Sequence, residues 1–169
     1  KYTVRTAGYV LVVRNWHIPC PASLPEEQTR VDAGESIWMN VLVIDKDPST
    51  AAGIAKMIEG VGHGAQSATN AKDALAKLAG WNFDVVVLDI CLPEVRGGRM
   101  IGEVRRVNPE VGIITMTAYN SKELEREIRK LGILYYIIKP VYVRDLADLL
   151  NHISSRIGRT SKYYEQGGN

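Results

Sequence analysis

From residue 40 onward, short apolar runs alternate with segments of helical periodicity, and this alternation constrains the fold more than any other feature of the chain. The apolar runs are roughly four to six residues long and rich in β-branched or aromatic residues, which is typical of buried strands. They lie at residues 41–44, 83–88, 113–116 and 135–138, with a weaker strand expected at 63–67. The pattern therefore predicts five strands.

Each predicted strand is followed by a segment in which apolar residues recur at helical spacing. In one of them, Ala71, Ala74 and Leu78 share a face, and Thr69 or Asn70 stands at the N-cap position. The predicted helices cover residues 49–61, 71–78, 99–107, 121–131 and 143–157. Because right-handed crossovers return the chain to the same sheet, this order predicts an α/β fold: a doubly wound five-stranded parallel sheet with helices on both faces.

Composition places the chain among ordinary globular proteins. Its 169 residues suffice for one domain with a short appendage, and 46% hydrophobic and 24% charged residues argue against disorder. The formal net charge of +2 is too even to draw the chain onto nucleic acid or an anionic membrane. No apolar run approaches a membrane span, and the two cysteines have no disulfide spacing. We therefore expect a cytoplasmic protein without direct contact to nucleic acid or membrane.

Polar residues follow four of the predicted strands at the point where each strand ends. These residues are Asp45, Asp89, Thr117 and Lys139. The carboxyl ends of parallel strands meet at one edge of a sheet, where such folds bind ligands. A buried carboxylate needs a cation or hydrogen bonds, and Lys139 is the available cation. An aspartate there can attack a phosphoryl group while a lysine and a divalent ion neutralise charge on the transferred oxygens.

Four sequence motifs resemble, in the expected order, those of the receiver domain of two-component response regulators. The motifs are VLVIDKDP, VVVLDICLPEVRGG, IITMTA and YYIIKP. The resemblance covers about residues 39–157, and it is specific because separate motifs agree in type, order and strand-end position. It implies a flavodoxin-like sheet with strand order 2-1-3-4-5. It also implies a stand-alone, chemotaxis-regulator-like signalling protein rather than an enzyme.

The same resemblance implies roles for individual residues. Asp89 would be the phosphoacceptor, and Asp45 would belong to the acidic pocket, with a weaker case for Asp47. The Lys139–Pro140 peptide bond would be cis. The phosphate-contacting and switch residues would be Thr117, Ala118, Lys139 and the aromatic Tyr136. The ligands of a magnesium ion would be Asp45, Asp89 and the backbone carbonyl of Cys91.

One residue in the first motif departs from the family pattern. Receiver domains usually have a second acid directly after the first, as a metal ligand, and this chain has Lys46 there. The swap changes the local charge by two units, so we expect weakened magnesium binding, and Lys46 could instead pair with Asp89. Asp47 also has a purely local explanation, as the N-cap of a helix that begins at Pro48.

The resemblance implies that a sensor histidine kinase or a phosphotransfer protein donates a phosphoryl group to Asp89. The phosphoryl oxygens would draw Thr117 inward and let Tyr136 bury, a population shift that changes the surface of the last two helices and the last strand. A downstream protein would bind this surface.

Two alternatives remain open. A degenerate receiver, disabled by Lys46, would act as a phosphorylation-independent interaction module. A haloacid-dehalogenase-like phosphatase would use Asp45 and Asp47 as its opening motif. That enzyme requires a further strand with an acidic pair, whereas Asp145 and Asp148 lie in a helical pattern.

The two ends of the chain differ in texture from its middle. Residues 1–38 carry one possible strand at 9–13 and then three prolines, and no motif emerges there. We interpret them as an N-terminal extension of unknown role; an artefact of start assignment and a strand that covers a sheet edge or forms a dimer are both open. Residues 39–157 form the expected receiver domain. Residues 158–169 are polar and glycine-rich, and we expect a flexible C-terminal tail.

Overall fold

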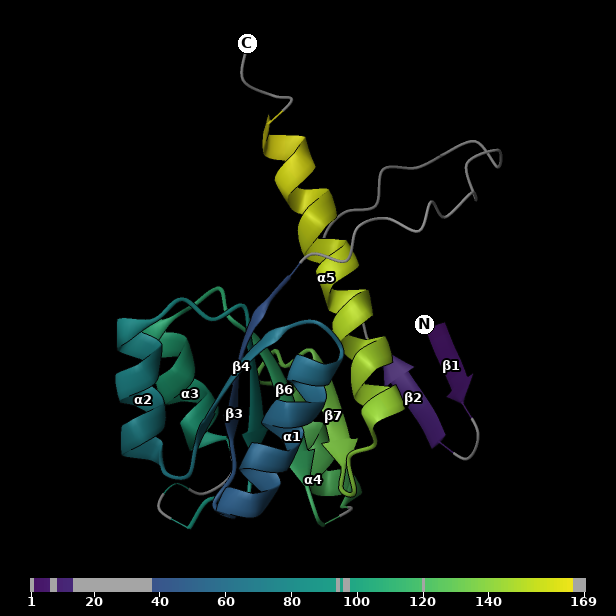
Figure 1. Ribbon diagram of the computed structural model, residues 1–169. Helices are drawn as coiled ribbons and strands as arrows, with labels where there is room; N and C mark the ends of the chain where they lie inside the picture. Colours follow the sequence, from purple (N-terminus) through teal and green to yellow (C-terminus); the bar gives the residue numbers. More distant parts are fainter. Residues whose placement is uncertain are drawn as a thin grey trace. The chain divides into compact units, whose positions relative to one another are not determined.

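The computed structural model describes the backbone of residues 2–6, 9–13, 38–93, 95, 98–119 and 121–165, and the side chains of those between 38 and 156. Strands and helices alternate from residue 40 onward, as Figure 1 shows. The strands are β1 (Tyr2–Thr6), β2 (Tyr9–Val13), β3 (Asn40–Ile44), β4 (Gly64–Ala68), β5 (Val85–Asp89), β6 (Gly112–Thr117) and β7 (Tyr135–Ile138). The helices are α1 (Pro48–Gly60), α2 (Ala71–Gly80), α3 (Arg99–Val107), α4 (Lys122–Arg129) and α5 (Val143–Glu165).

Strands β3 to β7 form a parallel five-stranded sheet in the order β4-β3-β5-β6-β7. Numbered from β3, this is the predicted order 2-1-3-4-5, so the fold class is confirmed. The register aligns Ile44 with Leu88, and Asp89 with Met116 on the next strand. The carboxyl ends of the strands consequently lie together, at the lower edge of the sheet in Figure 1.

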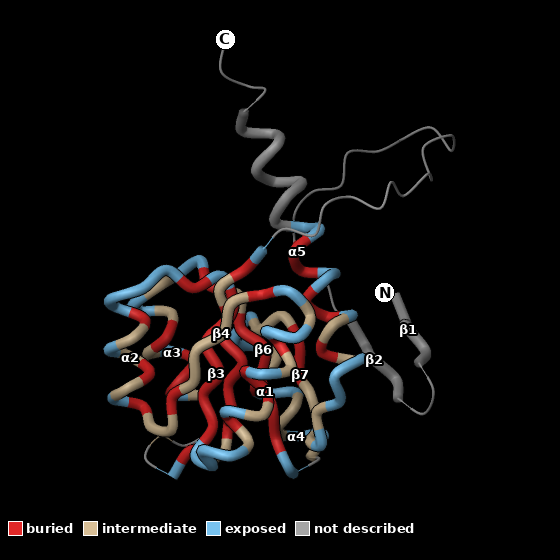
Figure 2. The backbone as a smooth tube through the Cα atoms, in the orientation of Figure 1, coloured by how far each residue is buried: buried red, intermediate tan, exposed pale blue. Residues whose placement is uncertain are grey.

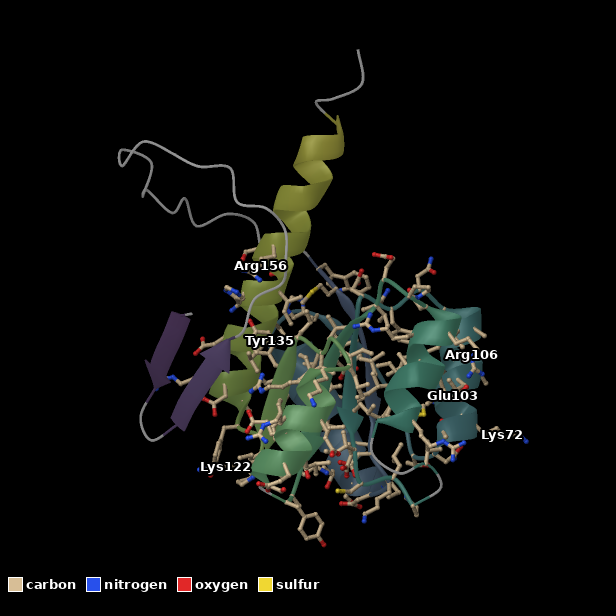
Figure 3. All side chains as sticks on the ribbon, turned by 180° about the vertical axis from the view of Figure 1, so that it is seen from behind. Lys72, Glu103, Arg106, Lys122, Tyr135 and Arg156 are labelled. Atoms are coloured by element: carbon tan, nitrogen blue, oxygen red, sulfur yellow. The ribbon has the colours of Figure 1, made fainter. Side chains whose placement is uncertain are left out.

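Helices cover both faces of this sheet. Figures 1 and 3, which view the molecule from opposite sides, show α1 and α5 on one face and α2, α3 and α4 on the other. Side chains alternate along each strand, so successive residues face opposite layers. Leu42, Ile44, Val86 and Leu88 belong to the cluster that packs with α2, α3 and α4. The intervening valines are equally buried and face the other layer.

The core lies within the sheet and along the inner stripes of the helices, as the burial map in Figure 2 shows. All five residues of β5 are buried, which is typical of a central parallel strand covered on both faces. Strand β4, at the edge, is only half-buried, and this explains its weak apolar signal in the sequence. Figure 3 shows Lys72, Glu103 and Arg106 on the outer surface of α2 and α3, where charged side chains stay hydrated.

The N-terminal segment differs from the sequence expectation. Strand β2 pairs with β1 in antiparallel register, and these two strands form a sheet separate from the five-stranded one. The sequence indicated β2 but not β1. Residues 1–35 form a compact unit distinct from residues 36–169. The proline-containing part of the expected extension, residues 14–37, lies outside the described residues.

Helix α5 also differs, because it continues past residue 157 to Glu165, through most of the expected flexible tail. The segment includes Gly158, which costs about 1 kcal/mol in a helix interior but does not end a helix that is already in register. No proline interrupts it, and the last four residues of the chain lie outside the described residues. None of the helices in the described part of the chain has the length and apolar character that crossing a bilayer requires.

Candidate functional site

Four strands deliver the polar residues that the sequence singled out to one edge of the sheet. Asp45 follows β3, Asp89 is the last residue of β5, Thr117 is the last residue of β6, and Lys139 follows β7. Backbone hydrogen bonds continue the ladder here, because Asp45 N donates to Ala68 O at 3.1 Å and Lys139 N donates to Thr117 O at 2.8 Å. These residues are therefore held by the sheet itself.

An ion triad occupies the centre of this edge. Lys139 Nζ donates to Asp45 Oδ2 at 2.5 Å and to Asp89 Oδ2 at 2.8 Å. Both aspartates are almost fully buried, with 1% and 2% of their surface exposed. The second carboxylate oxygens accept from backbone amides, Asp47 N to Asp45 Oδ1 at 3.0 Å and Cys91 N to Asp89 Oδ1 at 2.8 Å. Each oxygen thus has a partner, which is what permits two buried carboxylates side by side.

The two carboxylates of this triad change the pKa of Lys139. Burial by itself lowers the pKa of Lys139, but the hydrogen bonds and the negative charges of Asp45 and Asp89 outweigh it, so the pKa of Lys139 is raised. The ammonium form is therefore held firmly at neutral pH. One of its three N–H groups remains for a further acceptor after the two carboxylates are bound.

Thr117 lies beside this triad, but its hydroxyl turns towards the following loop. Its Oγ1 accepts a hydrogen bond from Tyr119 N at 3.0 Å and donates to Tyr119 O at 3.3 Å. The sulfur of Cys91 lies 3.7 Å from the same oxygen. Ala118, between Thr117 and Tyr119, is exposed. The hydroxyl thus fixes the connection between β6 and α4.

Tyr136 on β7 is buried in the core beneath α4. Burial raises the pKa of its phenol, with a smaller contribution from Glu125. Thr117 is close enough to affect the pKa of Tyr136. The phenol hydroxyl of Tyr136 nevertheless makes no hydrogen bond within the described part of the chain. The Arg129 guanidinium lies 6.0 Å from the ring centroid and pairs with Glu125 at 2.7 Å. The sequence reasoning missed Arg129, although the spacing of Glu125 and Arg129 along a helix could have indicated the pair.

Asp47 and Lys46 do not join the triad. Asp47 is the N-cap of α1, and its carboxylate accepts from Ser49 N at 3.1 Å, from Thr50 N at 3.2 Å and from Thr50 Oγ1 at 2.5 Å. The Thr50 hydrogen bond, followed by the others, lowers the pKa of Asp47. Lys46 is exposed and makes no ion pair with any residue that the structure describes.

This edge of the sheet offers a divalent cation fewer oxygen donors than the usual receiver pattern would, because position 46 carries a lysine. Among the described residues, no three side chains of histidine, cysteine, aspartate or glutamate come together in a way that could hold a metal ion. The expected ligands Asp45 and Asp89 each bind Lys139 through one oxygen. Hard cations such as Mg²⁺ require oxygen donors, and an ammonium group at position 46 supplies none.

A cavity opens next to the triad, between α1 and the loop after β7. It has a volume of about 280 Å³. The Lys139–Pro140 peptide bond beside it is cis. The residues that line it are Thr50, Gly53, Ile54, Met57, Lys139, Pro140 and Val141. Lys139 thus belongs to the triad and also lines this cavity.

Known sequences resemble this chain over the region that forms the five-stranded sheet. A family model described as "Response regulator receiver domain" matches residues 41–151. The transcriptional regulatory protein ZraR of Salmonella typhimurium is 34% identical over 103 residues, a match that covers 61% of this chain and 23% of that protein. The chain therefore spans about a quarter of the length of this curated relative.

Solved structures with the same fold include receiver domains. The receiver domain of a Francisella response regulator is 29% identical and superimposes with a TM-score of 0.65, covering 70% of this chain and 98% of that one. A Burkholderia pseudomallei response regulator protein "with a phosphorylated aspartic acid, calcium ion and citrate" has a TM-score of 0.62 and 24% identity, covering 77% of this chain and 75% of that one. At this identity the second likeness concerns the fold alone.

Proposed function

This chain belongs to the response regulator receiver family, and we propose that it accepts a phosphoryl group on Asp89 and signals through a phosphorylation-dependent protein contact. The observation that carries the proposal is the position of Asp89. It ends the central strand, it is buried, and one of its oxygens lies 2.8 Å from a lysine ammonium. Buried groups of this kind are retained where chemistry needs them.

The chain's own residues account for each part of the transfer. One carboxylate oxygen of Asp89 forms a bond to phosphorus while the bond from phosphorus to the donor atom breaks, and the leaving group takes that electron pair. Lys139 stays at the reacting centre and neutralises charge on the transferred oxygens with its remaining N–H. A phosphohistidine of a sensor kinase or a phosphotransfer protein is the donor that the family membership supports.

The response would begin at Thr117. Its hydroxyl now binds both backbone polar groups of Tyr119. A phosphoryl group on Asp89 would offer it a charged acceptor, which forms a stronger hydrogen bond than a neutral carbonyl. Tyr119 would then lose both bonds, and the start of α4 would be free to move. The ring of Tyr136 is already buried here, so its expected inward movement is not the first step.

The surface available for a downstream partner lies over α4, β7 and α5. It carries several large apolar side chains that are exposed within the described part of the chain, including Tyr119, Ile138, Tyr142 and Val143. Tyr119 is 70% exposed and directly follows the switch residues. Exposed apolar side chains contribute to protein contacts where they form a continuous patch. Movement at Thr117 would therefore change a surface suited to binding another protein.

The other interpretations make different demands. The phosphatase needs a strand with an acidic pair after the lysine, whereas Asp145 and Asp148 lie in helix α5. An interaction module that is never phosphorylated would keep the ion triad of Asp45, Asp89 and Lys139 as its permanent state.

We also propose that the protein is cytoplasmic, because a donor kinase whose catalytic domain acts in that compartment would meet it there.

The test is intact mass spectrometry of the full chain after incubation with acetyl phosphate and Mg²⁺. We expect one phosphoryl adduct on the wild type and on Asp148→Asn, a control on the exposed side of α5, and none on Asp89→Asn. An adduct that persists in Asp89→Asn but disappears in Asp45→Asn would favour the phosphatase. Absence of any adduct on the folded wild type would favour the interaction module.

A further inference from the structure

Lys46 stands at the carboxyl end of β3, directly after buried Asp45 and before the helix cap Asp47. It is exposed, and within the part of the chain that the structure describes it forms no salt bridge. A lysine that directly follows Asp45 and has no acidic partner of its own among the described residues is free to bind an incoming anion. Lysine is suited to this, because its ammonium is a compact charge with three donors that binds phosphate groups.

The charge of the pocket is consistent with such a role. The segments that end β3, β5 and β7 carry three carboxylates, Asp45, Asp47 and Asp89, and two ammonium groups, Lys46 and Lys139, so one negative charge remains. An acid at position 46 would leave three negative charges. A dianionic phosphoryl group would be strongly repelled by that pocket unless a divalent cation were bound. With Lys46 in place, the pocket has much less need of such an ion.

No neighbouring carboxylate takes over the role of the missing acid. The two oxygens of Asp47 are used by Ser49 and Thr50 at the start of α1. Turning this side chain towards a metal would leave the first amides of the helix without partners. Asp45 and Asp89 each have one oxygen bound to the Lys139 ammonium and the other bound to a backbone amide. The residues of this pocket thus fit a cationic side chain better than a metal ion.

We propose that the Lys46 ammonium replaces the divalent cation, so that Asp89 accepts a phosphoryl group in the absence of metal ions. The inference rests on the proposed function, since it concerns the same acceptor. With acetyl phosphate as donor, an Asp89 oxygen bonds to phosphorus, the bond from phosphorus to the acetyl oxygen breaks, and acetate leaves with the electron pair. No proton or electron is required from elsewhere.

The experiment compares the rate of adduct formation in metal-free buffer with EDTA and in buffer with Mg²⁺, using the full chain and acetyl phosphate. The variants are Lys46→Gln, which removes the charge, and Lys46→Asp, which supplies the acid. Lys72→Gln on the outer face of α2 is the matched control (Figure 3). Both positions are exposed, so the three variants should fold, and circular dichroism checks this.

We expect the wild type and Lys72→Gln to form the adduct at rates that agree within about twofold with and without Mg²⁺. In EDTA, Lys46→Gln should be slower by about tenfold, which corresponds to about 1.4 kcal/mol. Lys46→Asp should form the adduct only with Mg²⁺. A wild type that loses its adduct in EDTA, or a Lys46→Gln variant as fast as the wild type in EDTA, would overturn the proposal.

Calorimetric titration with Mg²⁺ provides a second readout that does not depend on phosphotransfer. Lys46→Asp should bind Mg²⁺ measurably, and the wild type should bind it at least about tenfold more weakly, a difference of about 1.4 kcal/mol. Equal affinities would contradict the role of Lys46. An adduct that requires Mg²⁺ refutes this inference alone, whereas no adduct under any condition refutes the phosphoacceptor function as well.

Discussion

Lys139 Nζ lies 2.8 Å from Asp89 Oδ2, although the two residues are 50 positions apart in the chain. The same nitrogen lies 2.5 Å from Asp45, so a single ammonium holds two buried carboxylates together. The sheet sets this arrangement, because β3, β5 and β7 end at the same edge. If Asp89 is the acceptor, as we propose, its cation is in place before any donor arrives, and no rearrangement of the strands is needed.

The first prediction concerns the stability of this triad. Lys139→Met should lower the free energy of unfolding by about 2 kcal/mol, because it leaves two carboxylates without their cation. This is less than the about 3–5 kcal/mol expected for a fully buried pair, since the Lys139 side chain is 20% exposed. Urea denaturation measures it, with Lys122→Met on the surface of α4 as control. Equal losses in the two variants would show that the triad contributes nothing.

A second prediction separates the two interpretations of Asp47. If Asp47 serves only as the N-cap of α1, Asp47→Ser should keep both the Tm and the rate of phosphorylation close to wild type, because serine also caps helices. Asp47→Ala should lower the Tm by a few degrees without a change in the rate. Thermal denaturation and intact mass spectrometry measure the two effects. A rate that falls equally in both variants would instead identify the carboxylate as part of the acceptor site.

The five-stranded fold could be predicted from the sequence because the apolar runs have the length of strands and polar residues follow them at their ends. Buried parallel strands such as β5 leave an uninterrupted apolar run, and the polar residues that end these runs meet at one edge in any such sheet. Strand β1 was missed because its five residues, YTVRT, lack the apolar character that marked β2. The end of α5 was missed because Gly158 indicates a helix end only where the glycine adopts the left-handed backbone conformation of a C-cap, and α5 continues through it.

Within the site, the sequence indicated which residues meet but not how they bond. Nothing in the order of residues shows that Lys139 binds both Asp45 and Asp89, or that the Thr117 hydroxyl binds Tyr119. These contacts depend on side-chain rotamers and on the loop after β6. Likewise, sequence alone left two roles for Asp47, and the hydrogen bonds to Ser49 and Thr50 place it at the helix cap.

A third prediction follows from the hydrogen bond between Tyr119 N and Thr117 Oγ1. Phosphorylation should draw the hydroxyl away, so the Tyr119 amide should exchange with solvent at least about threefold faster, as expected when a local bond opens. Thr117→Val should show the fast exchange already without phosphorylation, and Thr117→Ser should behave like the wild type. Amide exchange by NMR measures this. An unchanged Tyr119 rate in the phosphorylated wild type would rule out Thr117 as the first moving part.

A fourth prediction uses His63, which is buried before β4 and whose two ring nitrogens have no hydrogen-bond partner among the described residues. Burial lowers its pKa below the ordinary 6.5. The unfolded chain therefore binds more protons than the folded one below that pH, so stability falls as the pH falls. Between pH 7.5 and 5.5 this single group should account for up to about 1.4 kcal/mol.

The comparison variant is His63→Leu, which removes the titrating group and the unpaired nitrogens. It should be at least as stable as the wild type at pH 7.5, and its advantage should grow at pH 5.5. Urea denaturation at both pH values measures the difference. If the gap between the two proteins is the same at both pH values, protonation of His63 is not coupled to folding.

The most direct test of the central claim locates the phosphoryl group itself. The protein is first incubated with acetyl phosphate and then reduced with borohydride, which converts an acyl phosphate to an alcohol. A phosphorylated aspartate thereby becomes homoserine, whereas free carboxylates do not react. Peptide sequencing by tandem mass spectrometry should find homoserine at position 89 and aspartate at positions 45 and 47. Homoserine at position 45, or at none of the three positions after a phosphoryl adduct has formed, would contradict the assignment of Asp89 as the acceptor.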